Sequence, residues 1–188
     1  MKKFLLFTLV FASFSIYAQR RSNGWALQAR YGLMQGKGDI MGNAVETNLG
    51  TSITIGNKGV LAELNLFAQD FSFEHKELKK EIPYQLYGLN IMGGWSYEGI
   101  RKLYLNFKAG GFAGYSIVNK GDAKEDVYGT TFVNPVKGIT YGAVGSPEVE
   151  LVVFRKLTAI VSYTQYFYPN DKWIRWQYTV NAGLKLYF

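Results

Sequence analysis

The residues best suited to chemistry in this 188-residue chain are two glutamates, Glu148 and Glu150, two positions apart in one extended segment. In a β-strand such residues project from the same face, which would hold the two carboxylates about 7 Å apart. Paired carboxylates at this kind of spacing can serve as the acid and base of glycoside hydrolysis. No aromatic sugar platform or cleft accompanies them in the sequence, so we interpret both glutamates as buried packing residues and expect no enzymatic activity.

The composition also argues against most other catalytic chemistry. The chain contains no cysteine, which excludes a disulfide framework, a cysteine-ligated zinc site, a thiol nucleophile and a lipoprotein anchor. Its single histidine, His75, leaves no histidine pair for a metal and argues against a Ser-His-Asp triad. Asp122, Glu125 and Asp126 lack the spacing of a calcium-binding EF-hand loop. We therefore expect no catalytic residue, no metal and no cofactor.

The first eighteen residues have the layout of a secretory signal peptide. Lys2 and Lys3 precede an apolar run over residues 4–14, and the segment ends on the small residue Ala18. The run is too short for a transmembrane helix, which needs about 20 apolar residues. Removing the signal would lower the formal charge from +7 to +5 and take the chain out of the cytoplasm. A role on cytoplasmic DNA, which the basic charge alone would suggest, is then disfavoured.

The remaining residues, 19–188, alternate between apolar and polar side chains with a period of two. From Trp176 to Phe188 every even-numbered residue is apolar, whereas most odd-numbered residues are polar or small. Such alternation is typical of a strand with one apolar and one polar face. The same pattern predicts eight strands, at 25–33, 48–55, 60–69, 87–97, 103–114, 140–153, 157–167 and 176–188.

Two all-β architectures fit this alternation, a water-soluble sandwich and a membrane barrel. Three features favour the barrel: glycines on the polar faces, aromatic residues near the ends of the apolar faces, and a final strand that ends on phenylalanine. We therefore predict an eight-stranded antiparallel transmembrane β-barrel of the up-and-down type, located in the outer membrane. Its expected aromatic girdle comprises Trp25, Trp95, Tyr97, Phe167, Trp176 and Phe188.

The connections between the predicted strands alternate in length. Those after the second, fourth and sixth strands are short, whereas residues 35–43, 74–81, 119–138 and 169–175 form longer links. Outer-membrane barrels have short periplasmic turns and longer external loops. We therefore expect both termini in the periplasm.

Six charged residues fall on the polar faces of the predicted strands. An eight-stranded barrel has an interior just wide enough for side chains to fill it. Because unpaired charges there would be costly, we predict a hydrogen-bonded network of ion pairs that leaves no open pore. Its members are Arg30, Glu63, Lys108, Glu148, Glu150 and Lys185.

The external links supply the candidate contact residues. Residues 74–81 carry positive and negative charges, and we interpret them first as a solvated loop. The alternative is that Lys76, Lys79 and Lys80 bind lipopolysaccharide phosphates or a partner protein. The long link 119–138 is the expected docking surface, since loops of this length are commonly functional.

Several runs in the sequence resemble a known family. They are Gly111-Phe-Ala-Gly-Tyr-Ser-Ile-Val-Asn-Lys-Gly121, Ile82-Pro83, Tyr141-Gly142 ahead of Glu148 and Glu150, and Gly183-Leu-Lys185. Together with the chain length and the Ala18-Gln-Arg20 junction, they make the chain resemble the TraO family of Bacteroides-type conjugative transposons, best over residues 82–185.

The resemblance implies an outer-membrane component of a conjugal DNA-transfer apparatus, with other transfer proteins and membrane lipid as partners. It brings no catalytic residue and implies no direct contact with nucleic acid. Two alternatives stay open: an OmpX- or OmpA-like surface barrel for adhesion or envelope stability, and an outer-membrane lipid enzyme, which would have to use His75.

Overall fold

The computed structural model describes residues 24–35, 44–56, 59–75, 80–100, 102–123 and 135–188. Within these ranges the chain is almost entirely β-strand, with one turn of 3₁₀ helix at Asn119–Gly121. No helix in the described part of the chain is long and apolar enough to cross a membrane. The strands are β1 (Trp25–Met34), β2 (Val45–Ile55), β3 (Val60–His75), β4 (Lys80–Ile100), β5 (Leu103–Val118), β6 (Lys137–Val152), β7 (Leu157–Phe167) and β8 (Trp176–Tyr187).

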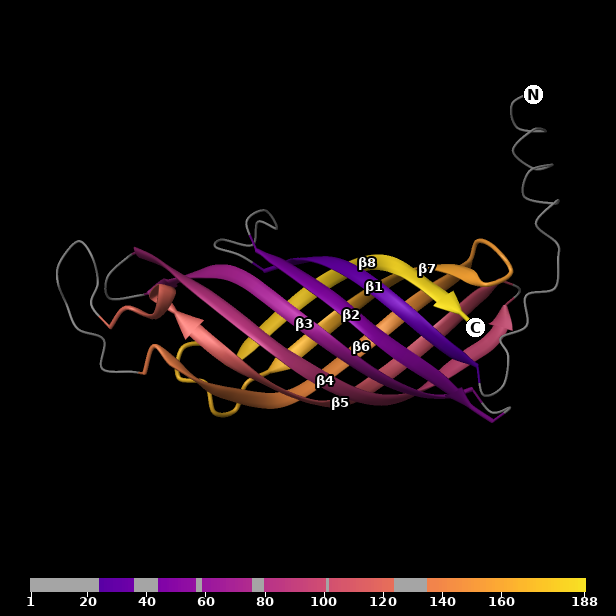
Figure 1. Cartoon of the computed structure of the whole chain (residues 1–188), viewed down its shortest axis with the longest axis horizontal. Helices are drawn as coiled ribbons and strands as arrows, with labels where there is room; N and C mark the ends of the chain where they lie inside the picture. The colour runs from indigo at the N-terminus through magenta and orange to yellow at the C-terminus, as the bar shows by residue number, and fades with distance from the viewer. Residues whose placement is uncertain (1–23, 36–43, 57–58, 76–79, 101, 124–134) are drawn as a thin grey trace, which may run out of the picture.

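The eight strands form one closed antiparallel barrel in which each strand pairs with its sequence neighbours (Figure 1). The closing seam joins β1 to β8, where Ala29 lies opposite Leu184 and Arg30 opposite Gly183. Closure leaves no strand edge unpaired along the wall, a condition that the hydrocarbon of a bilayer imposes on any sheet that spans it. The predicted fold class is therefore confirmed.

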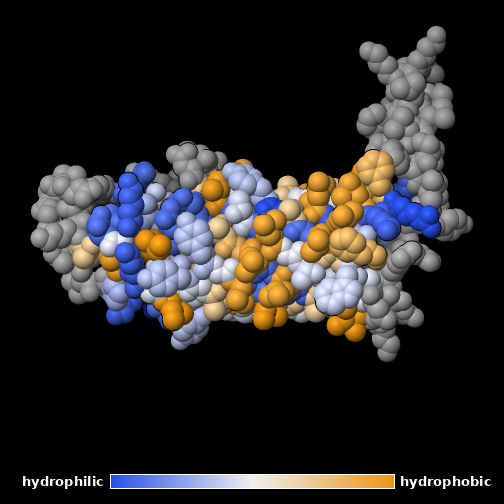
Figure 2. All heavy atoms as spheres, in the orientation of Figure 1, coloured by the Kyte–Doolittle hydropathy of each residue, from blue (hydrophilic) through white to orange (hydrophobic). Residues whose placement is uncertain are grey.

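Apolar side chains cover the outside of the wall. Along β1, residues from Trp25 to Leu33 are exposed at every odd position and buried at every even position. The other strands repeat this arrangement, so that leucine, valine and isoleucine form a hydrophobic band around the barrel (Figure 2). The same strands bury glutamine, asparagine, glutamate and lysine inside. This inside-out distribution is the one required of a barrel that faces lipid.

The two ends of the barrel differ. The connections β2–β3, β4–β5 and β6–β7 lie at one end, which we call the turn end, together with the C-terminus (Figure 1). Four strands, β3, β4, β5 and β6, are 16, 21, 16 and 16 residues long. A membrane-spanning strand needs about 9–11 residues, so these four strands continue beyond the bilayer at the opposite end, which we call the loop end. Figure 2 shows hydrophilic residues gathered at this end.

The extension of β3 and β4 corrects the predicted loop at 74–81. The two strands stay paired out to His75 and Lys80, which leaves only residues 76–79 to connect them. Likewise, the predicted link 119–138 is shorter, because β6 already begins at Lys137. Apolar and polar residues alternate in the part of a strand that has lipid on one side and the barrel interior on the other. Beyond the bilayer this alternation is lost, so the sequence does not predict the loop-end residues of β3, β4 and β6.

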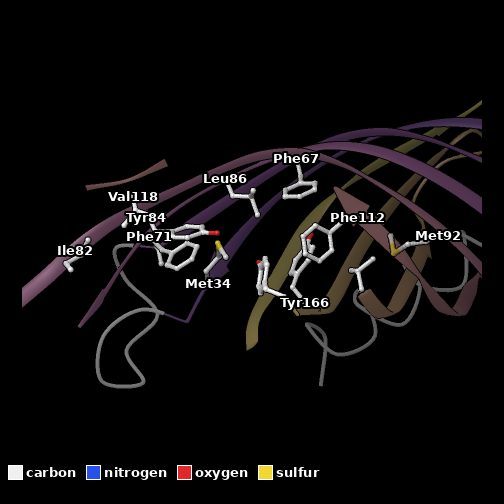
Figure 3. Packing of buried hydrophobic residues seen from close by; sticks show 13 residues of the cluster. Met34, Phe67, Phe71, Ile82, Tyr84, Leu86, Met92, Phe112, Val118 and Tyr166 are labelled. Carbon is white, nitrogen blue, oxygen red and sulfur yellow. The ribbon is translucent and has the colours of Figure 1, made fainter. Parts of the chain in front are cut away.

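The barrel interior contains a hydrophobic cluster that the alternation of residues does not predict. Phe67, Phe112 and Tyr166 meet inside the wall, with ring centroids 5.4–6.0 Å apart. Toward the loop end the cluster continues through Met34, Phe71, Ile82, Tyr84, Leu86 and Val118 (Figure 3). The interior is thus not filled by small residues and charges alone. Charges occupy one part of it and aromatic rings another.

Closure of the barrel can be tested with an engineered disulfide, because the chain has no native cysteine. Ala29→Cys and Leu184→Cys place two thiols on paired positions of β1 and β8. We expect oxidation to cross-link the folded chain in detergent, seen as a gel-mobility shift that a reductant reverses. The matched control combines Ala29→Cys with Leu66→Cys on β3, which is not adjacent to β1. Equal cross-linking of both pairs, or of neither, would contradict the closed topology.

Candidate functional site

The six charged residues predicted for the interior all have buried side chains, and they meet in one network. We call Arg30, Glu63, Lys108, Glu148, Glu150 and Lys185 the ion network. They come from β1, β3, β5, β6 and β8, and every one of them lies on the inward face of its strand. The network therefore connects wall segments that are far apart in the sequence.

Glu63 and Glu148 are bridged by two cations. Lys108 places its Nζ 2.7 Å from Glu63 Oε2 and 2.7 Å from Glu148 Oε2. The Arg30 guanidinium pairs with Glu63 through Nη2 and lies 3.3 Å from Glu148 Oε2 through Nη1. Asn65 also donates to Glu63 Oε1 at 2.7 Å, so both of the Glu63 oxygens accept hydrogen bonds.

Glu148 and Glu150 are joined through a third cation. Lys185 Nζ lies 3.0 Å from Glu148 Oε1 and 3.2 Å from Glu150 Oε2. Asn106 donates to the same two oxygens, at 2.8 Å and 3.2 Å. Tyr187 donates to the other oxygen of Glu150. Both carboxylates are therefore engaged by buried donors, and their arrangement is that of packing residues rather than of an acid–base pair open to a substrate.

Two glycines make room for the cations. Gly183 lies opposite Arg30, and a Cβ on it would meet Arg30 Cγ at 2.8 Å and the Ala29 carbonyl oxygen at 2.1 Å. Gly94 lies opposite Lys108, where a Cβ would meet Lys108 Cα at 2.9 Å. The aliphatic parts of the Arg30 and Lys108 side chains thus pass over glycines of the neighbouring strand. This gives the glycines on the polar faces a specific steric role.

Glu46 is a seventh buried charged residue in the described part of the chain, and it is not among the predicted interior charges. It is fully buried on β2 and accepts hydrogen bonds from Gln69 at 2.8 Å, Thr179 at 3.1 Å and Tyr166 at 3.2 Å, and also from Asn48. All four donors are uncharged. Glu46 precedes Asn48 by two residues in the sequence, and this spacing places both side chains on the inward face of β2.

Polar side chains also contact the aromatic cluster. Tyr166 contacts Glu46 on one side and packs against Phe67 and Phe112 on the other. Tyr168 donates to Gln69 at 2.9 Å and packs against Phe112. A side chain that lined a water-filled channel would be accessible to water. Instead, the exposed fraction is 6% for Arg30, 1% for Lys185 and 0% for Tyr166.

The residues of the expected girdle lie on the outside of the wall. Trp25, Trp95, Tyr97 and Phe188 are exposed near the turn end, and Trp176 is exposed near the loop end beside the half-buried Phe167. Trp and Tyr favour the two interfaces of a bilayer, so these positions mark the expected borders of the lipid-facing band. Further exposed tyrosines complete the loop-end border: Tyr31, Tyr87, Tyr115, Tyr141 and Tyr163.

The structure does not show whether the predicted contact residues Lys76, Lys79 and Lys80 lie together. Lys76 and Lys79 lie outside the described residues, as do the predicted signal peptide and residues 124–134 of the predicted long link. Lys80 is the first residue of β4, paired with His75 through the backbone. In the described ranges, no group of three His, Asp or Glu side chains is arranged to hold a metal.

Comparisons with known proteins agree on the fold. No family model matches the chain, and no curated protein matches it. Among solved structures, Neisserial surface protein A matches with a TM-score of 0.64 at 10% identity, over 87% of this chain and 97% of that one. Ail, the attachment invasion locus protein of Yersinia pestis, matches with 0.57 at 12% identity, over 89% and 100%. The outer membrane protein OprG of Pseudomonas aeruginosa matches with 0.55 at 8% identity, over 92% and 99%.

These likenesses and the inside-out wall define the class of protein. The chain is a closed eight-stranded β-barrel of the outer-membrane type. At these identities the likeness extends to the fold alone. No comparison supports the TraO family in particular, so that resemblance rests on the sequence runs quoted above.

Neutralising Glu148 should strongly destabilise the barrel. Glu148→Gln leaves Arg30, Lys108 and Lys185 with one fewer carboxylate in a site that excludes water. Breaking a buried ion pair by removing one partner costs about 3–5 kcal/mol. We expect a decrease of that order in the free energy of unfolding, measured with urea in lipid vesicles. The exposed Asp122→Asn is the matched control, and equal stability of the two variants would show that the network is not needed.

The glycine beside Arg30 provides a second, steric test. Gly183→Ala should cost about 1–3 kcal/mol, because its methyl group would overlap the Ala29 carbonyl and the Arg30 side chain. Gly145→Ala on β6 is the matched control, since a Cβ there has open space around it. The same urea titration compares the two. If both alanines were tolerated equally, close approach of β8 to Arg30 would be refuted.

Proposed function

We propose that this chain is a non-enzymatic barrel of the outer membrane that acts through contacts made at its loop end. The observation that carries the proposal is the sealed interior. Ion pairs fill one part of the barrel and aromatic rings another, which leaves the extramembrane surfaces as the places where another molecule can bind. We further propose that both termini face the periplasm and that the loop end lies outside the cell.

The more specific form of the proposal is a role in conjugal DNA transfer, by contact with other transfer proteins. Its support is the resemblance of residues 82–185 to the TraO family. The part of the barrel available for such contacts is the extension of β3, β4, β5 and β6 beyond the bilayer, together with the loops that follow β5 and β7. No contact with nucleic acid is proposed.

A surface barrel for adhesion or envelope stability is the second candidate. Its support is the fold shared with Ail, which is described as an attachment invasion locus protein. The two candidates predict different phenotypes. An adhesion or envelope barrel would alter surface binding or detergent sensitivity without changing DNA transfer.

Deletion of the gene in a mobilisable element tests the conjugal role. We expect the donor transfer frequency to fall by more than tenfold and to recover on complementation with the wild-type chain. Detergent sensitivity of the donor serves as the control for envelope integrity. Normal transfer by an intact donor would contradict the conjugal role, and a detergent-sensitive donor with normal transfer would favour the second candidate.

A further inference from the structure

A small cup opens in the rim of the loop end, between the start of β6 and the loop that joins β7 to β8. Its volume is about 130 Å³, and Lys137, Ile139, Asn170, Lys172 and Trp173 are among its lining residues. The cup forms because β7 ends before it reaches the residues of β6 that lie nearest the loop end. The last pairing of the two strands joins Ala143 to Phe167, so the start of β6 has no strand beside it on that side.

The cup has a defined framework. The side chain of Asn170 takes the place of a strand: its Nδ2 donates to the Ile139 carbonyl at 2.9 Å, and its Oδ1 accepts from the Tyr141 amide at 3.1 Å. The indole nitrogen of Trp173 donates to the Pro135 carbonyl at 3.1 Å. The Trp173 ring also packs against that of Phe73, with the ring centroids 5.8 Å apart. The loop is thereby fixed to β6 on one side and to β3 on the other.

The charge of the cup is positive. The side chains of Lys137 and Lys172 are exposed, and neither side chain makes a hydrogen bond or ion pair within the described part of the chain. The Lys137 ammonium lies beside Gly121. The one acidic residue of the lining, Asp171, is already saturated. Its Oδ1 accepts from the amides of Trp173 and Ile174, at 2.7 Å and 3.3 Å, and its Oδ2 accepts from Tyr84 and Thr140.

The position of the cup relative to the bilayer indicates its ligand. Lys137, Ile139 and Tyr141 follow one another along the outward side of β6, and Tyr141 belongs to the loop-end tyrosine border. Tyrosines at such a border lie at the level of the lipid headgroups. Lys137 is therefore at or just beyond the headgroups. A compact ammonium there is suited to a phosphate oxygen.

We propose that the cup binds a phosphate of the sugar headgroup of an outer-leaflet glycolipid, lipopolysaccharide. Lys137 and Lys172 would each donate to the phosphate, and the indole of Trp173 would line the sugar side. The inference rests on the proposed location and orientation of the barrel, which place the loop end in the outer leaflet. It uses residues different from the predicted contacts Lys76, Lys79 and Lys80.

Binding can be measured on the full mature chain folded in phosphatidylcholine nanodiscs. Lipopolysaccharide without O-antigen is titrated, and the complex is followed by native mass spectrometry. We expect one bound glycolipid, and an affinity loss of about tenfold for Lys137→Gln or Lys172→Gln and on the order of a hundredfold for the double variant. Lys156→Gln, an exposed lysine in the β6–β7 turn, is the matched control and should bind as the wild type does.

Two further titrations identify the ligand group. Dephosphorylated lipopolysaccharide should bind as weakly as the double variant binds the intact glycolipid. Wild-type affinity of the double variant, or equal binding of the dephosphorylated glycolipid, would overturn the proposal. Displacement by inorganic phosphate at matched concentration would overturn the assignment to a glycolipid. Because the assay involves no DNA transfer, its failure leaves the conjugal role untouched, and normal transfer by the deletion strain leaves this site untouched.

Discussion

Charge buried inside a narrow barrel is the constraint on which the rest of this structure depends. Removing a carboxylate or ammonium from water is costly unless partner charges and hydrogen bonds compensate for the lost hydration. Glu148 meets this requirement by contacting cations from β1, β5 and β8 at once. A register slip of one residue in any of these strands would turn a charged side chain toward lipid. The ion network thus specifies the register of the barrel as well as filling it.

Because buried charges fill the barrel interior, the interior and the loop end of the protein have different roles. With the interior occupied by paired charges near Lys108 and by rings around Phe112, the wall serves as a support that holds the loop end beyond the bilayer. Strand length follows this division. β7 is only as long as a bilayer requires, whereas β4 continues well past it. The resulting uneven rim produces both the paired extension of β3 and β4 and the cup beside β6.

Much of the fold followed from the sequence, because lipid outside and a packed interior impose a strict period of two on every spanning strand. The alternation in β8 is the clearest case, and Lys185 on its polar face is buried in the barrel. The aromatic cluster was not predicted, since Phe67 and Phe112 are inward apolar residues that look like breaks in the alternation. Glu46 was missed because β2 has the weakest pattern. The cup depends on where β7 stops relative to β6, which is a property of strand pairing and not of any local motif.

The barrel interior is closed to water and ions. Single-channel recording of the folded wild-type chain in a planar lipid bilayer at neutral pH is the sharpest test of a closed interior. We expect a flat current trace at all applied voltages, equal to that of the bilayer alone, once insertion has been verified by protease protection of the wall. Repeated stepwise conductance from the wild-type chain would contradict it, because the ion network and the aromatic cluster could not then fill the barrel.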